Sequence, residues 1–173
     1  LYHLDTTTLE CDLIRGGQYP NSLSFLPADT FADGQEALVG YEHSSYVRIA
    51  PQTGEKQYIG GLHGGYQSSG DIVSVQGGGT FLTVRGSGCH DCLFEIAPRT
   101  GKRVHNWGPL EFGDVWGRAY WGGTAFAFTR TGEIHTVAFG TTTVTTALLQ
   151  PASDHLSFWG AGSSTRVPVA PPR

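Results

Sequence analysis

A repeated segment constrains the fold more than any other feature of the chain. Residues 46–54, with the sequence YVRIAPQTG, recur at 93–101 as LFEIAPRTG, and weaker copies stand at 1–8 and 134–142. Each copy has one apolar residue that we expect to face the core, and these are Leu4, Ile49, Ile96 and Val137. Their spacings of 45, 47 and 41 residues point to a structural unit of about 43 residues that occurs four times.

A second repeated piece divides each unit further. A short apolar strand before a Gly-rich turn occurs at 22–25, 71–75, 117–121 and 155–159. The segments between these pieces are short, rich in β-branched and aromatic residues, and bounded by Gly, Pro, Asn and Asp. A unit of this length with about four strands is typical of a β-propeller blade.

The chain resembles the β-propeller repeat proteins in which a D-P-x-T-G turn follows the third strand of each blade. The two middle copies carry Ala-Pro in place of Asp-Pro, at 50–51 and 97–98. The resemblance covers the whole chain and implies an all-β fold, a four-bladed β-propeller of four-stranded antiparallel blades in one domain, 1–173. The expected blades are 22–61, 70–108, 115–149, and a fourth that combines 154–170 with 1–15.

The fourth blade is expected to close the ring. The N-terminal residues supply two strands, at 1–4 and 11–14, and the C-terminal residues supply the complementary two, at 155–159 and 165–169. Pairing them removes the open sheet edges that invite aggregation. The alternatives are a fragment of a larger propeller, or two chains that complete one ring, and we expect a closed monomer.

Composition excludes several classes of protein. Eleven Lys and Arg against fifteen Asp and Glu give a net charge of −4, which disfavours a nucleic-acid-binding module. No apolar run approaches the roughly 18 residues of a membrane-spanning helix. The chain starts without Met and ends in the Pro-rich segment 167–173, which is typical of a mature or excised domain of a secreted, periplasmic or cell-surface protein.

Propellers usually bind ligands on the face made by the D–A and B–C loops, where D–A joins neighbouring blades and B–C joins the second and third strands. Aromatic rings there could stack on a sugar, while amide, carboxylate and imidazole groups bind hydroxyls. The expected ligand-binding residues are Tyr19, Asn21, His63, Tyr66, Asp71, Asp114, Trp116, Asp154 and His155. Tyr19 and Tyr66 occupy equivalent places in neighbouring blades, so the alternative for them is packing between blades.

A small polar residue precedes the first strand of each blade, and the three that are acidic suggest a metal site or a catalytic site. Asp71, Asp154 and His155 could hold calcium or zinc at the channel mouth, or act as general acid and base in a hydrolase or lyase. The alternative is that such residues cap turns through backbone N–H groups. The chain contains no G-x-S-x-G, H-E-x-x-H or phosphate-loop motif.

The three cysteines have different expected roles. Cys89 and Cys92 flank a two-residue spacer in the predicted B–C turn, where a disulfide would close a long hairpin in an oxidising compartment. Redox chemistry of the thioredoxin type needs a helix N-terminus, and no helix is expected here. Cys11 is expected to be a buried free thiol.

Together these features favour a binding module that recognises a glycan or a protein partner through this loop face. Two alternatives stay open, because propellers host many functions. One is a small hydrolase or lyase, metal-assisted or not, at the channel mouth, and the other is a structural repeat domain of a larger surface protein. The sequence decides neither enzymatic activity nor metal content.

Overall fold

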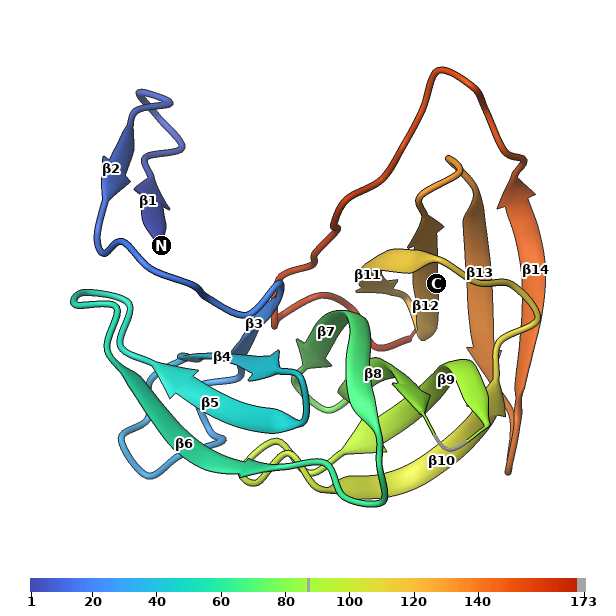
Figure 1. The fold of residues 1–173 in the computed structure, drawn as a ribbon, viewed down its shortest axis with the longest axis horizontal. Coiled ribbons are helices and arrows are strands. Elements are labelled where there is room, and N and C mark those ends of the chain that lie inside the picture. Colours follow the sequence, from blue (N-terminus) through green and yellow to red (C-terminus); the bar gives the residue numbers. More distant parts are fainter. Residues whose placement is uncertain (87, 171–173) are drawn as a thin grey trace.

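A computed structural model describes residues 1–86 and 88–170 of the chain (Figure 1). Residue 87, in the predicted B–C turn of blade 2, and residues 171–173 of the Pro-rich end lie outside the described part. Fourteen β-strands and no helix are found in the described residues. The all-β prediction is therefore confirmed.

Twelve of these strands form three four-stranded antiparallel sheets. Sheet 1 contains β3 (Ser22–Leu26), β4 (Ala37–Glu42), β5 (Ser45–Ile49) and β6 (Lys56–Gly61). Sheet 2 contains β7 (Gln67–Val75), β8 (Gly79–Gly86), β9 (Cys89–Ile96) and β10 (Arg103–Pro109). Sheet 3 contains β11 (Val115–Trp121), β12 (Thr124–Thr129), β13 (Ile134–Phe139) and β14 (Val144–Gln150). Each pairs its strands in chain order, as the repeat predicts.

The repeated A-P-x-T-G segment forms the same turn in sheets 1 and 2. Gly54 and Gly101 have φ of 68° and 64°, in the left-handed region that favours glycine. Each donates its N–H to the carbonyl oxygen of the repeat alanine four residues earlier, Ala50 or Ala97, at 2.7 and 2.8 Å. The sequence repeat is thus a repeat of backbone geometry.

The sheets follow one another around an arc, with their first strands on its inner side (Figure 1). The first strand of sheet 2, β7, contacts both β3 and β11. One apolar cluster joins sheets 1 and 2, and its aromatic members Tyr41 and Tyr46 donate hydroxyl hydrogen bonds to the carbonyls of Gly101 and Pro98. These bonds fix the repeated turn of sheet 2 against sheet 1. A second cluster joins sheets 2 and 3.

The N-terminal residues form the predicted hairpin, β1 (Tyr2–Leu4) and β2 (Cys11–Leu13). The hairpin stands apart from the three sheets in Figure 1 and pairs with no other strand of the described residues. Its free thiol, Cys11, is exposed, so the prediction that Cys11 is buried is wrong.

The two C-terminal strands expected at 155–159 and 165–169 do not form, and the structure does not show ring closure. The tail 151–170 instead crosses the inner side of the arc, where Thr165 and Pro168 carbonyls accept N–H bonds from Gln76 and Gly122, both at 2.8 Å. Pro168 has no N–H to donate to a neighbouring strand. Gly160 is also unfavourable there, because glycine is depleted in β-strands. The segment therefore has little tendency to form strands by itself.

Candidate functional site

A cleft of about 490 Å³ opens on the loop face that the sequence singled out. Its lining comes from the loop before β3, the β4–β5 turn, and parts of β6, β7, β8 and β11. The lining residues are Gln18, Tyr19, Pro20, Asn21, Tyr41, Glu42, His43, Lys56, Ser68, Ser69, Arg85 and Trp116. A hollow of similar size, about 510 Å³, lies along the A–B and C–D connections of sheet 1, and no aromatic side chain lines it. The aromatic and polar cleft is the better candidate site.

A lysine fixes one wall of the cleft. Lys56 forms an ion pair with Glu42 and donates a second hydrogen bond to the Gln18 carbonyl at 3.0 Å. Its ammonium also lies 5.5 Å from the centre of the Tyr19 ring. The Tyr19 hydroxyl donates to the carbonyl of Gly54 at 2.6 Å. This wall is preorganised, and the charge of Lys56 is neutralised by its neighbour.

A strained turn places an imidazole at the edge of the cleft. His43 lies between β4 and β5 with φ of 57°, a conformation that is uncommon for residues other than glycine. Its carbonyl accepts the N–H of Ser68 at 2.9 Å, which ties the turn to sheet 2. Backbone strain of this kind costs on the order of 1 kcal/mol and often occurs at functional sites.

Two irregularities in strand pairing position further cleft residues. Trp116 lies at a register shift between Val115 and Gly117 in β11. Its side chain is half-buried and lines the cleft. Ser69 lies in a longer irregularity between Ser68 and Ile72 in β7. A β-bulge redirects side chains relative to a regular strand, and such bulges are common near binding sites.

The Trp116 ring also contacts the C-terminal tail. Its centre lies 5.4 Å from that of Trp159, with the two ring planes inclined at 56°. Trp159 itself is 67% exposed, so it supports Trp116 from one side without being buried. The tail therefore contributes to the orientation of a cleft residue, although it does not line the cleft.

Beside the cleft lies a buried charged cluster made by Asp71, Asp91 and Arg118. Arg118 is fully buried and donates from Nε to the Thr83 hydroxyl at 3.3 Å, while its two terminal nitrogens have no hydrogen-bond partner among the described residues. Asp91 accepts a bond of 2.6 Å from the hydroxyl of Ser69, which lines the cleft. Through the bond between Ser69 and Asp91, the cluster is connected to the lining of the cleft.

Burial shifts the protonation of this cluster. It raises the pKa of Asp71 to about 7, against the opposing effects of the Ala161 N–H, which donates to the carboxylate at 2.9 Å, and of Arg118. It lowers the pKa of Arg118 to about 10, and the nearby carboxylates of Asp91 and Asp71 oppose that shift. Arg118 stays charged near neutral pH, whereas the raised pKa of Asp71 lies close to neutrality.

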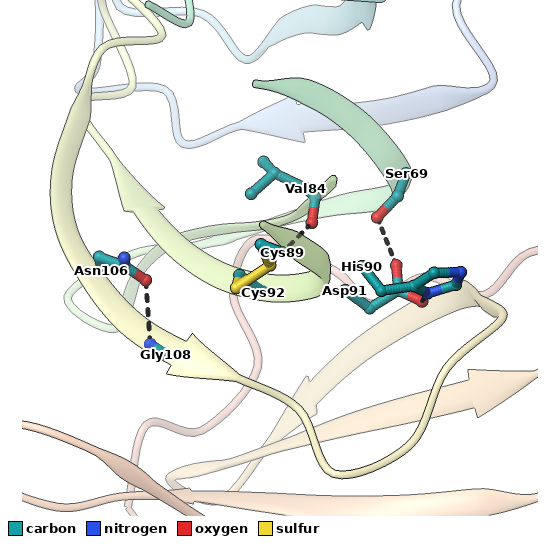
Figure 2. The surroundings of a disulfide bond; sticks show 8 residues. All are labelled: Ser69, Val84, Cys89, His90, Asp91, Cys92, Asn106 and Gly108. Carbon is teal, nitrogen blue, oxygen red and sulfur yellow. Dashed lines mark hydrogen bonds and ion pairs between the residues drawn. A yellow bond between two sulfur atoms is a disulfide. The ribbon is translucent and has the colours of Figure 1, made fainter. Parts of the chain in front are cut away.

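A disulfide joins Cys89 and Cys92 at the start of β9 (Figure 2). The bridge closes a loop that contains His90 and Asp91. Asp91 faces Ser69 with one oxygen and the His90 imidazole with the other, at 3.2 Å (Figure 2). The aspartate lies between the serine and the histidine, so the histidine does not contact the serine as it would in a Ser-His-Asp triad.

Three of the nine expected ligand-binding residues line the cleft, namely Tyr19, Asn21 and Trp116. Tyr66 does not line the cleft: it packs edge-on against Phe94 of β9 with ring centres 4.8 Å apart, at the border of the apolar cluster that joins sheets 1 and 2. Asp114 forms an ion pair with Arg130 at 3.3 Å.

The remaining expected residues do not come together. The side chains of His63, Asp154 and His155 are exposed and make no hydrogen bond or ion pair with the described residues, and Asp71 is buried beside the tail. Within residues 1–86 and 88–170, no group of three His, Cys, Asp or Glu side chains is arranged to hold a metal ion. The expected set of Asp71, Asp154 and His155 is therefore not assembled in this structure.

Sequence reasoning missed Lys56, Glu42 and Arg85 as cleft residues. Arg85 ends the second strand predicted for blade 2, directly before the predicted B–C turn, and lies next to the end of β8, so this position was a usable signal. Lys56 gave no signal, because it begins the fourth strand and reaches the cleft only through its long side chain.

Comparison with known proteins gives no assignment: no protein-family model matches the chain, and no curated protein matches its sequence. The part of the chain that the structure describes has no helix long and apolar enough to cross a membrane. The cleft itself is therefore the feature from which a function can be inferred.

Proposed function

We propose that the chain is a recognition module that binds a saccharide in the cleft between Tyr19 and Trp116. The observation that carries the proposal is Trp116, an indole that lies at a strand irregularity and lines a cleft together with Tyr19 and several polar side chains. An aromatic face covers the apolar side of a sugar ring, while amides and hydroxyls such as those of Asn21 and Ser68 bind its hydroxyl groups. The Cys89–Cys92 disulfide is compatible with a secreted or surface-exposed protein.

The test begins with a glycan array probed with the purified chain, followed by calorimetric titration of the best hit. Trp116→Ala should weaken binding about tenfold, which corresponds to roughly 1.4 kcal/mol of lost stacking and burial. Trp121→Ala is the matched control, because Trp121 lies on the same strand, is 53% exposed and does not line the cleft.

An array without any hit would reject the saccharide proposal. Equal losses from both tryptophan variants would reject the cleft as the binding site. Circular dichroism of each variant verifies that the fold is intact, so that weaker binding reports contact with the ligand.

We also propose that the protein closes into a four-bladed propeller, with the tail and the hairpin as its fourth blade. Exposed apolar side chains concentrate in these two terminal segments: the hairpin region exposes Tyr2, Leu4, Leu9 and Leu13, and the tail exposes Leu156, Trp159 and Val169. Such residues favour burial, at roughly 25 cal/mol per Å² of apolar surface. A fourth blade would give both segments a common partner.

Hydrogen exchange tests the closure directly. Slow exchange of amides in 155–159 and 165–169, at rates similar to those of β1, would support a fourth blade. Fast exchange throughout both segments, with slow exchange in sheets 1 to 3, would reject it.

A further inference from the structure

The charges that line the cleft are not balanced. Its charged side chains are Glu42, Lys56 and Arg85, and the first two form an ion pair with each other. The Arg85 side chain is exposed and makes no hydrogen bond or ion pair with any described residue. A guanidinium group without a protein partner is thus left facing the cleft.

The surroundings of Arg85 make this charge distinctive. Although the chain as a whole carries a net charge of −4, the described side chains that line the cleft leave one positive charge, that of Arg85, without an ion-pair partner. Glu42, the carboxylate that lines the cleft, does not compensate it, because Glu42 is held by Lys56. Asp91, which accepts a hydrogen bond from the cleft residue Ser69, is buried. Arg85 is therefore free to bind an anionic group of a ligand.

We propose that the ligand of this cleft is an acidic saccharide whose carboxylate binds Arg85 while its ring lies on Trp116. The inference rests on the proposed saccharide-binding function and names the class of sugar. The guanidinium offers two parallel N–H donors that match the two oxygens of a carboxylate, which a lysine ammonium cannot do. Arg85 and Trp116 line the same cleft, so one ligand can contact both.

The structure also favours an acidic sugar over a simple anion. An isolated anion would gain only the exposed guanidinium, which is strongly screened by water and salt. A sugar acid adds contacts to the Trp116 ring and to polar groups such as the Asn21 amide, and those contacts set its orientation. The carboxylate then acts as a specificity element on a ligand that the cleft already holds.

The experiment uses a matched pair of probes that differ at one carbon, methyl β-glucuronide and methyl β-glucoside. Titration calorimetry with the full chain should show the glucuronide binding about tenfold more tightly, and the difference should shrink as salt is added. Arg85→Gln should abolish the preference for the glucuronide, so that the two probes bind with about equal affinity. Arg166→Gln is the control, because Arg166 is also exposed, makes no side-chain contact among the described residues, and lies outside the cleft.

Two further outcomes have separate meanings. Equal binding of both probes by the unmodified chain would overturn the acidic-sugar inference and leave the saccharide proposal standing. Absence of binding by every saccharide on the array would overturn both. Glucose 6-sulfate separates the two sources of negative charge: weaker binding than the glucuronide supports the carboxylate, and tighter binding overturns it.

Discussion

Asp71 should make the stability of this protein fall as the pH rises toward neutrality. Asp71 is only 7% exposed, and burial raises the pKa of its carboxyl from 3.8 to about 7. At pH values between 3.8 and about 7, Asp71 keeps a proton in the folded protein that it has released in the unfolded chain. The free energy of unfolding contributed by this group is therefore fully present below about pH 4 and is lost as the pH rises through 7.

The size of the effect follows from the shift. One pKa unit corresponds to about 1.4 kcal/mol, so the shift from 3.8 to about 7 amounts to at most about 4 kcal/mol. Asp71→Asn keeps an oxygen that can accept the Ala161 N–H and removes the charge. The variant should match the unmodified protein near pH 4 and exceed its stability by a few kcal/mol at pH 8.

Urea unfolding at several pH values, followed by tryptophan fluorescence, measures this difference. The comparison of variant with unmodified protein cancels the groups that both share, including Asp5 and Asp33, whose pKa values are lowered by hydrogen bonds. Asp154→Asn is the control, because Asp154 is exposed and without a side-chain partner in the described residues. Parallel stability curves for Asp71→Asn and the unmodified protein between pH 4 and pH 8 would refute the reasoning.

Two further predictions concern the backbone and the thiols. Gly101→Ala should destabilise the protein by about 2 kcal/mol or more, since its Cβ would lie 2.5 Å from the Tyr46 ring at a φ of 64°, whereas Gly34→Ala, at a φ of 65° in open space, should cost only about 1 kcal/mol. Equal losses in thermal or urea unfolding would contradict the steric argument. A thiol reagent should label one cysteine per native chain, Cys11, and peptide mapping that finds Cys89 or Cys92 labelled would contradict the disulfide.

The strands and turns of the three sheets could be predicted from the sequence, because short-range sequence preferences determine them. Gly54 and Gly101 end a repeated turn that needs the left-handed backbone, and their spacing set the register of the predicted blades. The conformation of the tail could not be predicted. Its apolar residues resemble those of a strand, but whether a strand forms depends on a partner far away in the sequence. In this structure the tail forms backbone hydrogen bonds to turns of the other sheets, such as that of Gln76 between β7 and β8, in place of a sheet of its own.

The sequence predicted the loop face on which the candidate site lies, but it did not predict which side chains meet there. Tyr19, Asn21 and Trp116 were found because the loops at one end of the predicted blades were expected to share a surface, and these three residues line one cleft. The register shift at Trp116 could not be foreseen, since a bulge is defined by the strand opposite to it. Arg85 and Lys56 reach the cleft from different sheets, and such convergence depends on the packing of the sheets.

The position of the tail and the state of the cleft are coupled through few contacts. Every lining residue of the cleft belongs to the segment between Gln18 and Trp116, so neither the hairpin nor the tail forms its walls. The tail acts on the cleft through Trp159, which packs against Trp116, and on the neighbouring charged cluster through the Ala161 N–H bond to Asp71. If the tail moved into a fourth blade, the Trp159 contact could be kept only by a matching shift of Trp116. Because Trp116 carries the proposed stacking interaction, any movement of the tail that breaks this contact must change ligand affinity, while the ion pair of Lys56 with Glu42 stays intact.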